Sequence, residues 1–166
     1  MKKNKILLIG GSGNLGTHII NSKIFKDLYY PKKKNLNLLN SNQISKILAK
    51  HKISIIINCA STARMRECEK NIGKAIENNI FSTFNLVNEI LKYEKKFKKK
   101  IKLIYLSSDA VYPSTKGNYK EESSLGPYNN YGWTKLSAEF LVKIIENHII
   151  LRTRFYDKNK IKYKYS

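Results

Sequence analysis

The chain has 166 residues, 42% of them hydrophobic, and this length and composition fit one soluble globular domain with a core of its own. Lys and Arg number 32 against 12 Asp and Glu, which gives a formal net charge of +20, a balance that nucleic-acid binders share. No apolar stretch is long enough to span a membrane and two cysteines are too few for a disulfide framework, so a membrane protein and a disulfide-rich scaffold are excluded.

Apolar runs alternate with helical patterns along the chain, which predicts β-α-β units around a parallel sheet. In chain order we expect a strand at 5–9, a helix from about 14 to 26, a weak strand at 28–30, a helix at 43–50 and a strand at 53–58. A long helix at 79–91, a strand at 101–107, a helix at 131–146 and a strand at 149–153 follow. The stripe predicted to be buried on the long helix consists of Ile80, Phe84, Val87 and Leu91. Residues 1–156 would thus form one domain, and the basic tail at 157–166 is expected to be poorly ordered.

The amino-terminal residues argue against export. A basic start is followed by the apolar run Ile6 to Ile9, but Gly10 and Gly11 end that run before the roughly 7–15 apolar residues that an export signal needs. We therefore expect a cytoplasmic protein with no membrane partner.

The basic composition has two explanations. Of the 32 cations 28 are Lys, and the chain is also rich in Ile and Asn, a combination that an AT-rich genome tends to encode. The densest run, Lys92 to Lys102, follows a predicted helix, where cations also suit the negative end of the helix dipole. A solvated lysine surface is the favoured interpretation, and a phosphate-binding surface for nucleic acid is the alternative.

A glycine-rich segment, Gly10-Gly11-Ser12-Gly13-Asn14-Leu15-Gly16, lies between the first predicted strand and the first helix. Glycines allow a tight turn there and let backbone N–H groups approach a pyrophosphate at the helix N-terminus. The strand-turn-helix context supports a dinucleotide site, and a tight turn without a ligand is the alternative.

The acidic residue that usually holds the adenosine ribose is missing after the second predicted strand, where Lys32, Lys33 and Lys34 stand instead. Lysines would tolerate a 2′-phosphate better than a carboxylate would. A solvated lysine loop explains them equally well, so the cofactor is NADP or NAD.

Two further segments carry chemistry. Tyr131 and Lys135 are four residues apart on a predicted helix and therefore share one face. A neighbouring ammonium and an oxidised nicotinamide would lower the pKa of the Tyr131 phenol, which makes it a candidate acid-base group. Ser108, with Asp109 beside it, follows a predicted strand and could hydrogen-bond a substrate oxygen that gains negative charge. The alternatives are an exposed helix face for the first pair and a loop-capping turn for the second.

Together and in this order, these motifs resemble the extended short-chain dehydrogenase/reductase family, over residues 4 to 156, with a Rossmann-type doubly wound parallel α/β sheet. Within the family, the chain is most similar to dTDP-4-dehydrorhamnose reductases. The segments that carry this similarity are Ile56 to Ser61, Ser107 to Tyr112, Tyr131 to Glu139, and Ile150 to Thr153 followed by Phe155. The resemblance implies an NAD(P)-dependent oxidoreductase that reduces a 4-keto nucleotide sugar in polysaccharide biosynthesis.

The resemblance also implies residue roles. Tyr131 would donate the proton, Lys135 would tune it and bind ribose, and Ser108 with Asp109 would polarise the ketone. The implied cofactor-binding residues are Gly10, Ser12, Gly13, Asn14, Leu15, Gly16, Asn37, Leu38, Ser61, Thr62, Ala63, Asn79, Tyr131 and Lys135. The implied substrate-binding residues are Ser108, Asp109 and Phe155, and no metal ligands are expected.

The chain departs from the family pattern at several positions. Arg66 replaces an Asp, Ala63 a Thr and Ser108 a Thr, and the family continues into a C-terminal substrate region that is absent here. We therefore expect a fragment, a truncated gene product or a domain completed by another chain. The expected partners are a second copy of the chain in a homodimer or such a completing chain. An NAD-dependent sugar-nucleotide epimerase and a catalytically impaired dinucleotide-binding module are the alternative functions, and a 4,6-dehydratase is a weaker match because Ala110 stands where that group has Glu.

Overall fold

The computed structural model describes residues 5–154, so the predicted substrate residue Phe155 and the predicted tail at 157–166 lie outside the described residues. Five parallel strands form one sheet in the order β2-β1-β3-β4-β5. Their bounds are Lys5–Ile9 for β1, Leu28–Tyr29 for β2, Ile53–Asn58 for β3, Lys102–Ser108 for β4 and His148–Thr153 for β5. The predicted doubly wound parallel sheet is confirmed.

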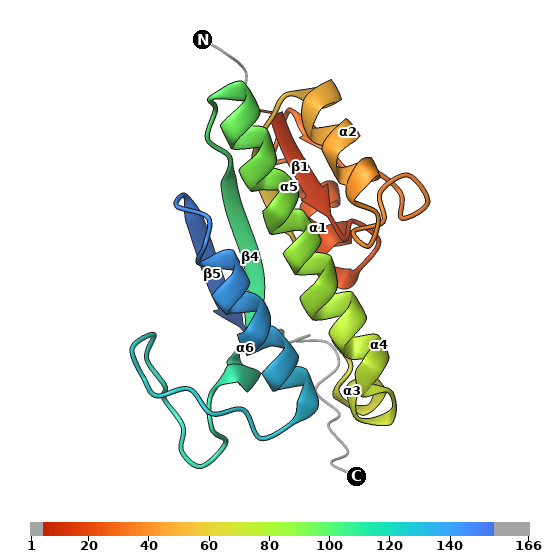
Figure 1. The fold of residues 1–166 in the computed structure, drawn as a ribbon. Coiled ribbons are helices and arrows are strands. Elements are labelled where there is room, and N and C mark those ends of the chain that lie inside the picture. The colour runs from red at the N-terminus through yellow and green to blue at the C-terminus, as the bar shows by residue number, and fades with distance from the viewer. Residues whose placement is uncertain (1–4, 155–166) are drawn as a thin grey trace.

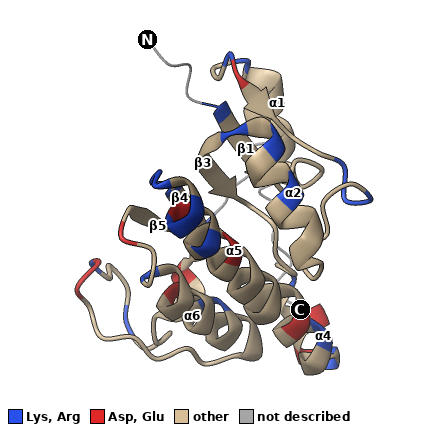
Figure 2. Cartoon of the chain, turned by 45° about the horizontal axis from the view of Figure 1, so that its top comes forward, with Lys and Arg blue, Asp and Glu red and all other residues tan. Residues whose placement is uncertain are grey.

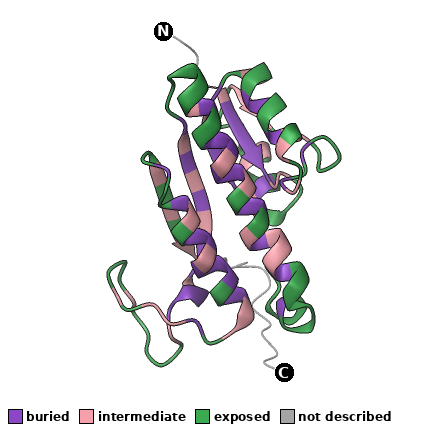
Figure 3. Cartoon of the chain, viewed as in Figure 1, coloured by how far each residue is buried: buried purple, intermediate pink, exposed green. Residues whose placement is uncertain are grey.

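Helices cover the two faces of the sheet unequally (Figure 1). One face is covered by α2 (Ser41–His51), α5 (Ser82–Phe97) and α6 (Asn130–Val142), whose apolar residues join those of β1, β3 and β4 in the main core. The other face packs against α1 (Asn14–Ser22). On that second face the outer strand β5 leaves Ile149 and Leu151 about 40% exposed, so its apolar surface is only partly covered by the described residues (Figure 3).

Short helices lie between β3 and α5, at the edge of the sheet where the strands end. They are α3 (Met65–Lys70), α4 (Ile72–Ile76) and a π-helical segment, η1 (Glu77–Phe81), which runs directly into α5. A 3-10 turn, η2 (Asp109–Val111), follows β4. None of the helices in the described part of the chain is both long and apolar enough to cross a bilayer.

The buried stripe predicted for the long helix is wrong in part. Val87 is buried, but Phe84 is 51% exposed and Leu91 is 38% exposed. The buried face of α5 instead carries Leu86 and Ile90. The physical reason is that α5 carries two overlapping apolar stripes, and the one that packs on the core is Leu86, Val87, Ile90 and Tyr93, which also recur at intervals of three or four residues.

Two other predicted helices end earlier than expected. The first stops at Ser22 rather than near residue 26, because Lys23 adopts a left-handed conformation with φ of 53° and its N–H caps the Ile20 carbonyl. The other, α6, ends at Val142 rather than 146. On its outer side Trp133 is 53% exposed.

Lys and Arg are spread over several elements rather than gathered on one face (Figure 2). They occur on α2 and on the end of α5, and also on the loop after β2. This distribution favours the compositional explanation of the charge over a dedicated nucleic-acid surface.

Candidate functional site

A cleft of about 670 Å³ opens at the edge of the sheet where the parallel strands end. The glycine turn after β1, the loop after β2 and the segment after β3 form its walls. The carboxyl ends of parallel strands are where open α/β sheets bind their ligands. The cleft therefore lies where the sequence predicts a nucleotide.

The glycine turn needs glycine for two separate reasons. Gly10 has φ of +83°, a conformation that other residues rarely adopt. At Gly16, a Cβ atom would lie 2.2 Å from the Gly10 carbonyl oxygen, so the first turn of α1 can approach β1 this closely only without a side chain. The result is a turn with an open wall at Gly10 and Gly13, directly before a helix N-terminus, which fits the pyrophosphate of a dinucleotide.

The residues predicted to bind the cofactor divide into two groups. Those that line the cleft are Gly10, Ser12, Gly13, Asn37, Leu38, Ser61 and Thr62. Those that do not line it are Asn14, Leu15, Gly16, Ala63, Asn79, Tyr131 and Lys135. The cleft thus accounts for the adenosine and pyrophosphate end of the predicted site, and the predicted chemistry lies beside it.

The adenosine end of the cleft is basic. Tyr30, Pro31, Lys32 and Lys33 follow β2 and line the wall, with no carboxylate among the lining residues. Asn37 is engaged locally: its N–H donates to Gln43 over 2.7 Å and its side-chain oxygen accepts from the Leu39 N–H. The surroundings therefore suit an anionic group on the ribose.

Cys59, which also lines the cleft, is half-buried, and burial raises the pKa of its thiol to about 11. It is therefore neutral at physiological pH and acts as a small packing residue. In residues 5–154 no cluster of three or more His, Cys, Asp or Glu side chains could hold a metal ion.

Tyr131 and Ser108 come together at the end of β4. Tyr131, in the first turn of α6, is buried, and its phenol interacts with the side chain of Ser108, the last residue of β4. The Ser108 hydroxyl also accepts from the Ala110 N–H and donates to Asp109, each over 3.2 Å. Asp109 in turn lies 3.7 Å from the guanidinium of Arg154. The phenol, the hydroxyl and the carboxylate predicted as catalytic thus form one connected group.

The electrostatics at Tyr131 differ from the sequence expectation. Burial raises the pKa of Tyr131 above its usual value, the interaction with Ser108 opposes this, and Cys68 and the Asp109 carboxylate add to it. Lys135 does not lower the pKa in the protein alone, because its amine faces other partners. The lowering expected from a positive neighbour would have to come with a bound cofactor.

Lys135 is almost completely buried, with an exposed fraction of 1%. Its amine donates to the Tyr105 hydroxyl over 2.8 Å and to the Leu106 carbonyl over 2.6 Å, both on β4. Burial lowers the pKa of Lys135 to about 7, while Glu139 and Cys59 oppose this lowering. The amine therefore changes its charge close to neutral pH.

Asn79 holds the site together rather than facing the cleft. It lies in η1 and is buried, with its side-chain oxygen 2.7 Å from the Thr62 N–H and its amide group donating to Thr134 over 2.9 Å. One side chain thus ties the loop after β3 to α6. A π-helical turn commonly marks such functional positions.

The sequence interpretation missed Tyr105 as a partner of Lys135. Its hydroxyl also shares a hydrogen bond with Thr83, and the Lys135 amine lies 4.2 Å from its ring centroid. The sequence did contain a signal for this role: Tyr105, a tyrosine with a polar hydroxyl, stands in the mostly aliphatic predicted core strand.

Comparison with known proteins gives a family match over nearly the whole chain. The family model described as RmlD substrate binding domain matches residues 4–163. The chain is 34% identical to methionine adenosyltransferase 2 subunit beta of Bos taurus over 119 residues, 72% of this chain but only 33% of that protein.

Two solved structures of dTDP-4-dehydrorhamnose reductases match the fold. The Clostridium acetobutylicum enzyme has a TM-score of 0.80 and 26% identity, covering 90% of this chain and 53% of its own. The Bacillus anthracis enzyme, solved in complex with NADP, has a TM-score of 0.81 and 25% identity, covering 92% and 54%. The chain therefore spans about half the length of these enzymes, and a third of the bovine relative.

Proposed function

Because the chain belongs to the RmlD substrate binding domain family, we propose that it binds NADP or NAD in the cleft and reduces a 4-keto nucleotide sugar. The resemblance inferred from its motifs is confirmed by this family match. The observation that carries the proposal is the interaction of the buried Tyr131 phenol with Ser108, at the strand edge where the glycine-walled cleft opens. In the proposal, Tyr131 would act as the proton donor and the Ser108 hydroxyl would bind the substrate oxygen.

The cleft residues supply binding in this proposal. Gly10 and Gly13 would hold the pyrophosphate against the N-terminus of α1, and Lys32 with Lys33 would face the adenosine ribose. When bound, the reduced nicotinamide supplies the hydride. Lys135, in its charged form, would hold hydroxyl groups of the ribose and stabilise negative charge on Tyr131.

The carbonyl oxygen of the sugar would contact side chains of α6 and β4. As the sugar carbonyl gains negative charge, the Ser108 hydroxyl would hydrogen-bond its oxygen and the Tyr131 phenol would give it a proton. The raised pKa of Tyr131 keeps the phenol protonated before the reaction, which is the state that a reductase requires at the start. Asp109 and Arg154, beside Ser108, would face the sugar.

A second candidate is a dinucleotide-binding module that does not turn over a sugar. It is supported by the bovine relative, whose name is that of a methionine adenosyltransferase subunit and whose identity exceeds that of the two reductases described above. In that case the cleft would serve an assembly, and the Tyr131 group would be unused.

The test combines calorimetric binding of NADPH and NADH with NADPH oxidation in the presence of dTDP-4-dehydrorhamnose. We expect micromolar binding and turnover, with Tyr131→Phe keeping the affinity and losing at least about 100-fold in rate. Tyr128→Phe, which alters an exposed tyrosine two residues before α6, is the matched control. Binding without oxidation would support the module, and absence of binding would refute both nucleotide functions.

A further inference from the structure

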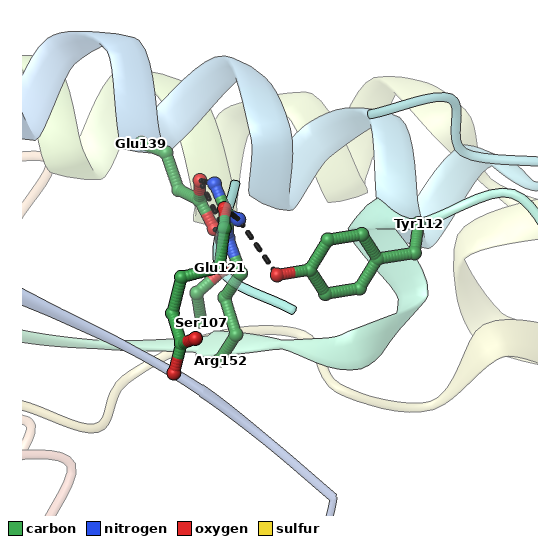
Figure 4. Close-up of polar contacts among 5 residues, drawn as sticks. All are labelled: Ser107, Tyr112, Glu121, Glu139 and Arg152. Atoms are coloured by element: carbon green, nitrogen blue, oxygen red, sulfur yellow. Dashed lines mark hydrogen bonds and ion pairs between the residues drawn. The ribbon is translucent and has the colours of Figure 1, made fainter. Parts of the chain in front are cut away.

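Behind the proposed catalytic group lies a buried ion pair that the proposed function does not use. Glu139 on α6 is 1% exposed, and Arg152 on β5 holds it with Nε 3.1 and 3.2 Å from the two carboxylate oxygens and Nη2 at 2.8 Å (Figure 4). The Ser107 hydroxyl on β4 donates to the same carboxylate over 2.5 Å. One carboxylate therefore joins a helix to two strands.

Arg152 also anchors the segment that leads into α6. Its Nη1 donates to the Tyr112 hydroxyl over 2.8 Å and to the Glu121 carbonyl over 3.0 Å, and its guanidinium lies 5.1 Å from the centroid of the Tyr112 ring (Figure 4). Tyr112 closes the turn after β4, and Glu121 belongs to the connection between that turn and α6. The pair thus links the last turn of α6 to the segment that precedes the helix.

Glu139 continues the helix face that carries the proposed chemistry. Tyr131, Lys135 and Glu139 follow one another at intervals of four residues, so they form one row along α6. Each member of the row contacts β4 at its carboxyl half: Tyr131 contacts Ser108, Lys135 contacts Tyr105 and Leu106, and Glu139 contacts Ser107. A slide of α6 along β4 would displace all three contacts together.

We propose that Glu139, held by Arg152, is a positioning residue of the site: it fixes the α6 row against β4 and supplies the negative charge beside the buried Lys135 amine. The inference rests on the proposed function for its catalytic meaning. Its physical content, the placement and the charge of Lys135, can be measured without turnover.

Among the ionisable groups around the Lys135 amine in residues 5–154, Glu139 is the carboxylate that acts on its pKa. The ionisable groups that face the amine are Tyr105 from β4, Cys59 from the segment after β3 and Glu139 from its own helix. Tyr105 and Cys59 are both neutral near pH 7, since burial raises the pKa of each. Glu139 is therefore the negative group that raises the pKa of the amine against the effect of burial.

The first experiment is an NMR titration of the Lys135 amine, followed through ¹³C-labelled lysine, in the whole chain and in Glu139→Gln. This substitution keeps the shape and a hydrogen-bond acceptor but removes the charge. We expect the Lys135 midpoint to fall by about one pH unit, with a several-fold weaker NADPH affinity at pH 7.5. Glu89→Gln is the matched control: it removes a buried carboxylate of α5, paired with Lys92 at 2.7 Å, and should leave both quantities unchanged.

A second variant separates positioning from stability. Replacing a buried ion pair by apolar residues of similar volume is often neutral or stabilising, so Glu139→Met with Arg152→Met should still fold and melt cooperatively. We expect that double variant to show a lowered Lys135 midpoint and weakened NADPH binding. The single variant Arg152→Lys keeps Glu139 and a positive charge beside it, so its NADPH affinity should lie between those of the double variant and the unmodified chain. A wild-type Lys135 midpoint in either Glu139 variant overturns the inference, even if the protein proves to have no reductase activity. Absence of NADPH binding by the unmodified chain refutes the proposed function, while the titration still decides the role of Glu139.

Discussion

The charge of Lys135 should make the stability of the fold depend on pH in a narrow window. The amine is 1% exposed, and burial lowers its pKa to about 7 in the folded chain, whereas an unfolded lysine titrates near about 10.4. Between these values the unfolded chain binds more protons than the folded one, so stability rises with pH. The perturbation is therefore a change from pH 7.0 to 8.5, made in the unmodified chain and in Lys135→Met.

The magnitude follows from the same pKa values. Each pH unit within the window contributes at most about 1.4 kcal/mol, so one and a half units make the fold more stable by about 2 kcal/mol. For a domain of this size 1 kcal/mol shifts the melting temperature by about 2–4 °C, which predicts a rise of about 4–8 °C. The window must stop near pH 8.5, because the buried Cys59 thiol, with its pKa raised to about 11, starts to act in the opposite direction above its ordinary value of 9.0.

Thermal melts followed by circular dichroism at several pH values measure the effect. Lys135→Met should lose the rise, because the variant has no buried amine to discharge. Lys143→Met, which removes an exposed amine just after the same helix, should keep it. If the unmodified chain and Lys135→Met show the same slope of melting temperature against pH, the buried amine is charged or exposed differently from this description and the reasoning fails.

Two further predictions concern the cleft. Gly16→Ala places a Cβ atom 2.2 Å from the Gly10 carbonyl oxygen, so it should weaken NADPH binding at least about tenfold, equivalent to about 1.4 kcal/mol. Gly117→Ala is the control, because the space around Gly117 is open and its affinity should not change. Equal affinities of the two variants by calorimetry would contradict this prediction. Lys32→Glu with Lys33→Glu should weaken NADP binding about tenfold or more and change NAD binding little, because only NADP carries the 2′-phosphate. Lys116→Glu outside the cleft is the control, and a parallel loss for both dinucleotides would show that the lysines do not contact that phosphate.

The parts of the fold that depend on local patterns could be predicted from the sequence. The strand at 53–58 has three consecutive Ile and is found at those bounds, since a central parallel strand is apolar on both faces. The glycine turn was predictable from a second local rule, because a left-handed backbone conformation and a close approach of the chain require glycine at fixed positions. Both features are decided by a few neighbouring residues.

Features that depend on distant partners could not be predicted. Asn79, in the π-helical segment Glu77–Phe81, contacts both the loop after β3 and α6. No periodicity in the helix itself reveals such a tie. The partners of Lys135 are likewise set by the packing of α6 on β4, so that Y-x-x-x-K spacing alone predicts a Tyr131–Lys135 pair where the structure has a Lys135–Tyr105 contact.

The state of Tyr131 bears on the direction of the proposed reaction. An enzyme that oxidises an alcohol needs a phenolate at the start, whereas one that reduces a ketone needs a phenol that still holds its proton. Burial and Asp109 both raise the pKa of Tyr131, so the protein alone holds it in the second state. A phenol is nevertheless a far stronger acid than the alcohol formed when a carbonyl is reduced, so the proton moves to the developing alkoxide. The phenolate left behind then needs a nearby cation. Lys135, four residues away on the same helix face and titrating near neutral pH, is the group in the described chain best placed to become that cation. The protonated Tyr131 therefore suits the start of the proposed reduction, and in that proposal Lys135 would act on Tyr131 after the proton transfer rather than before it.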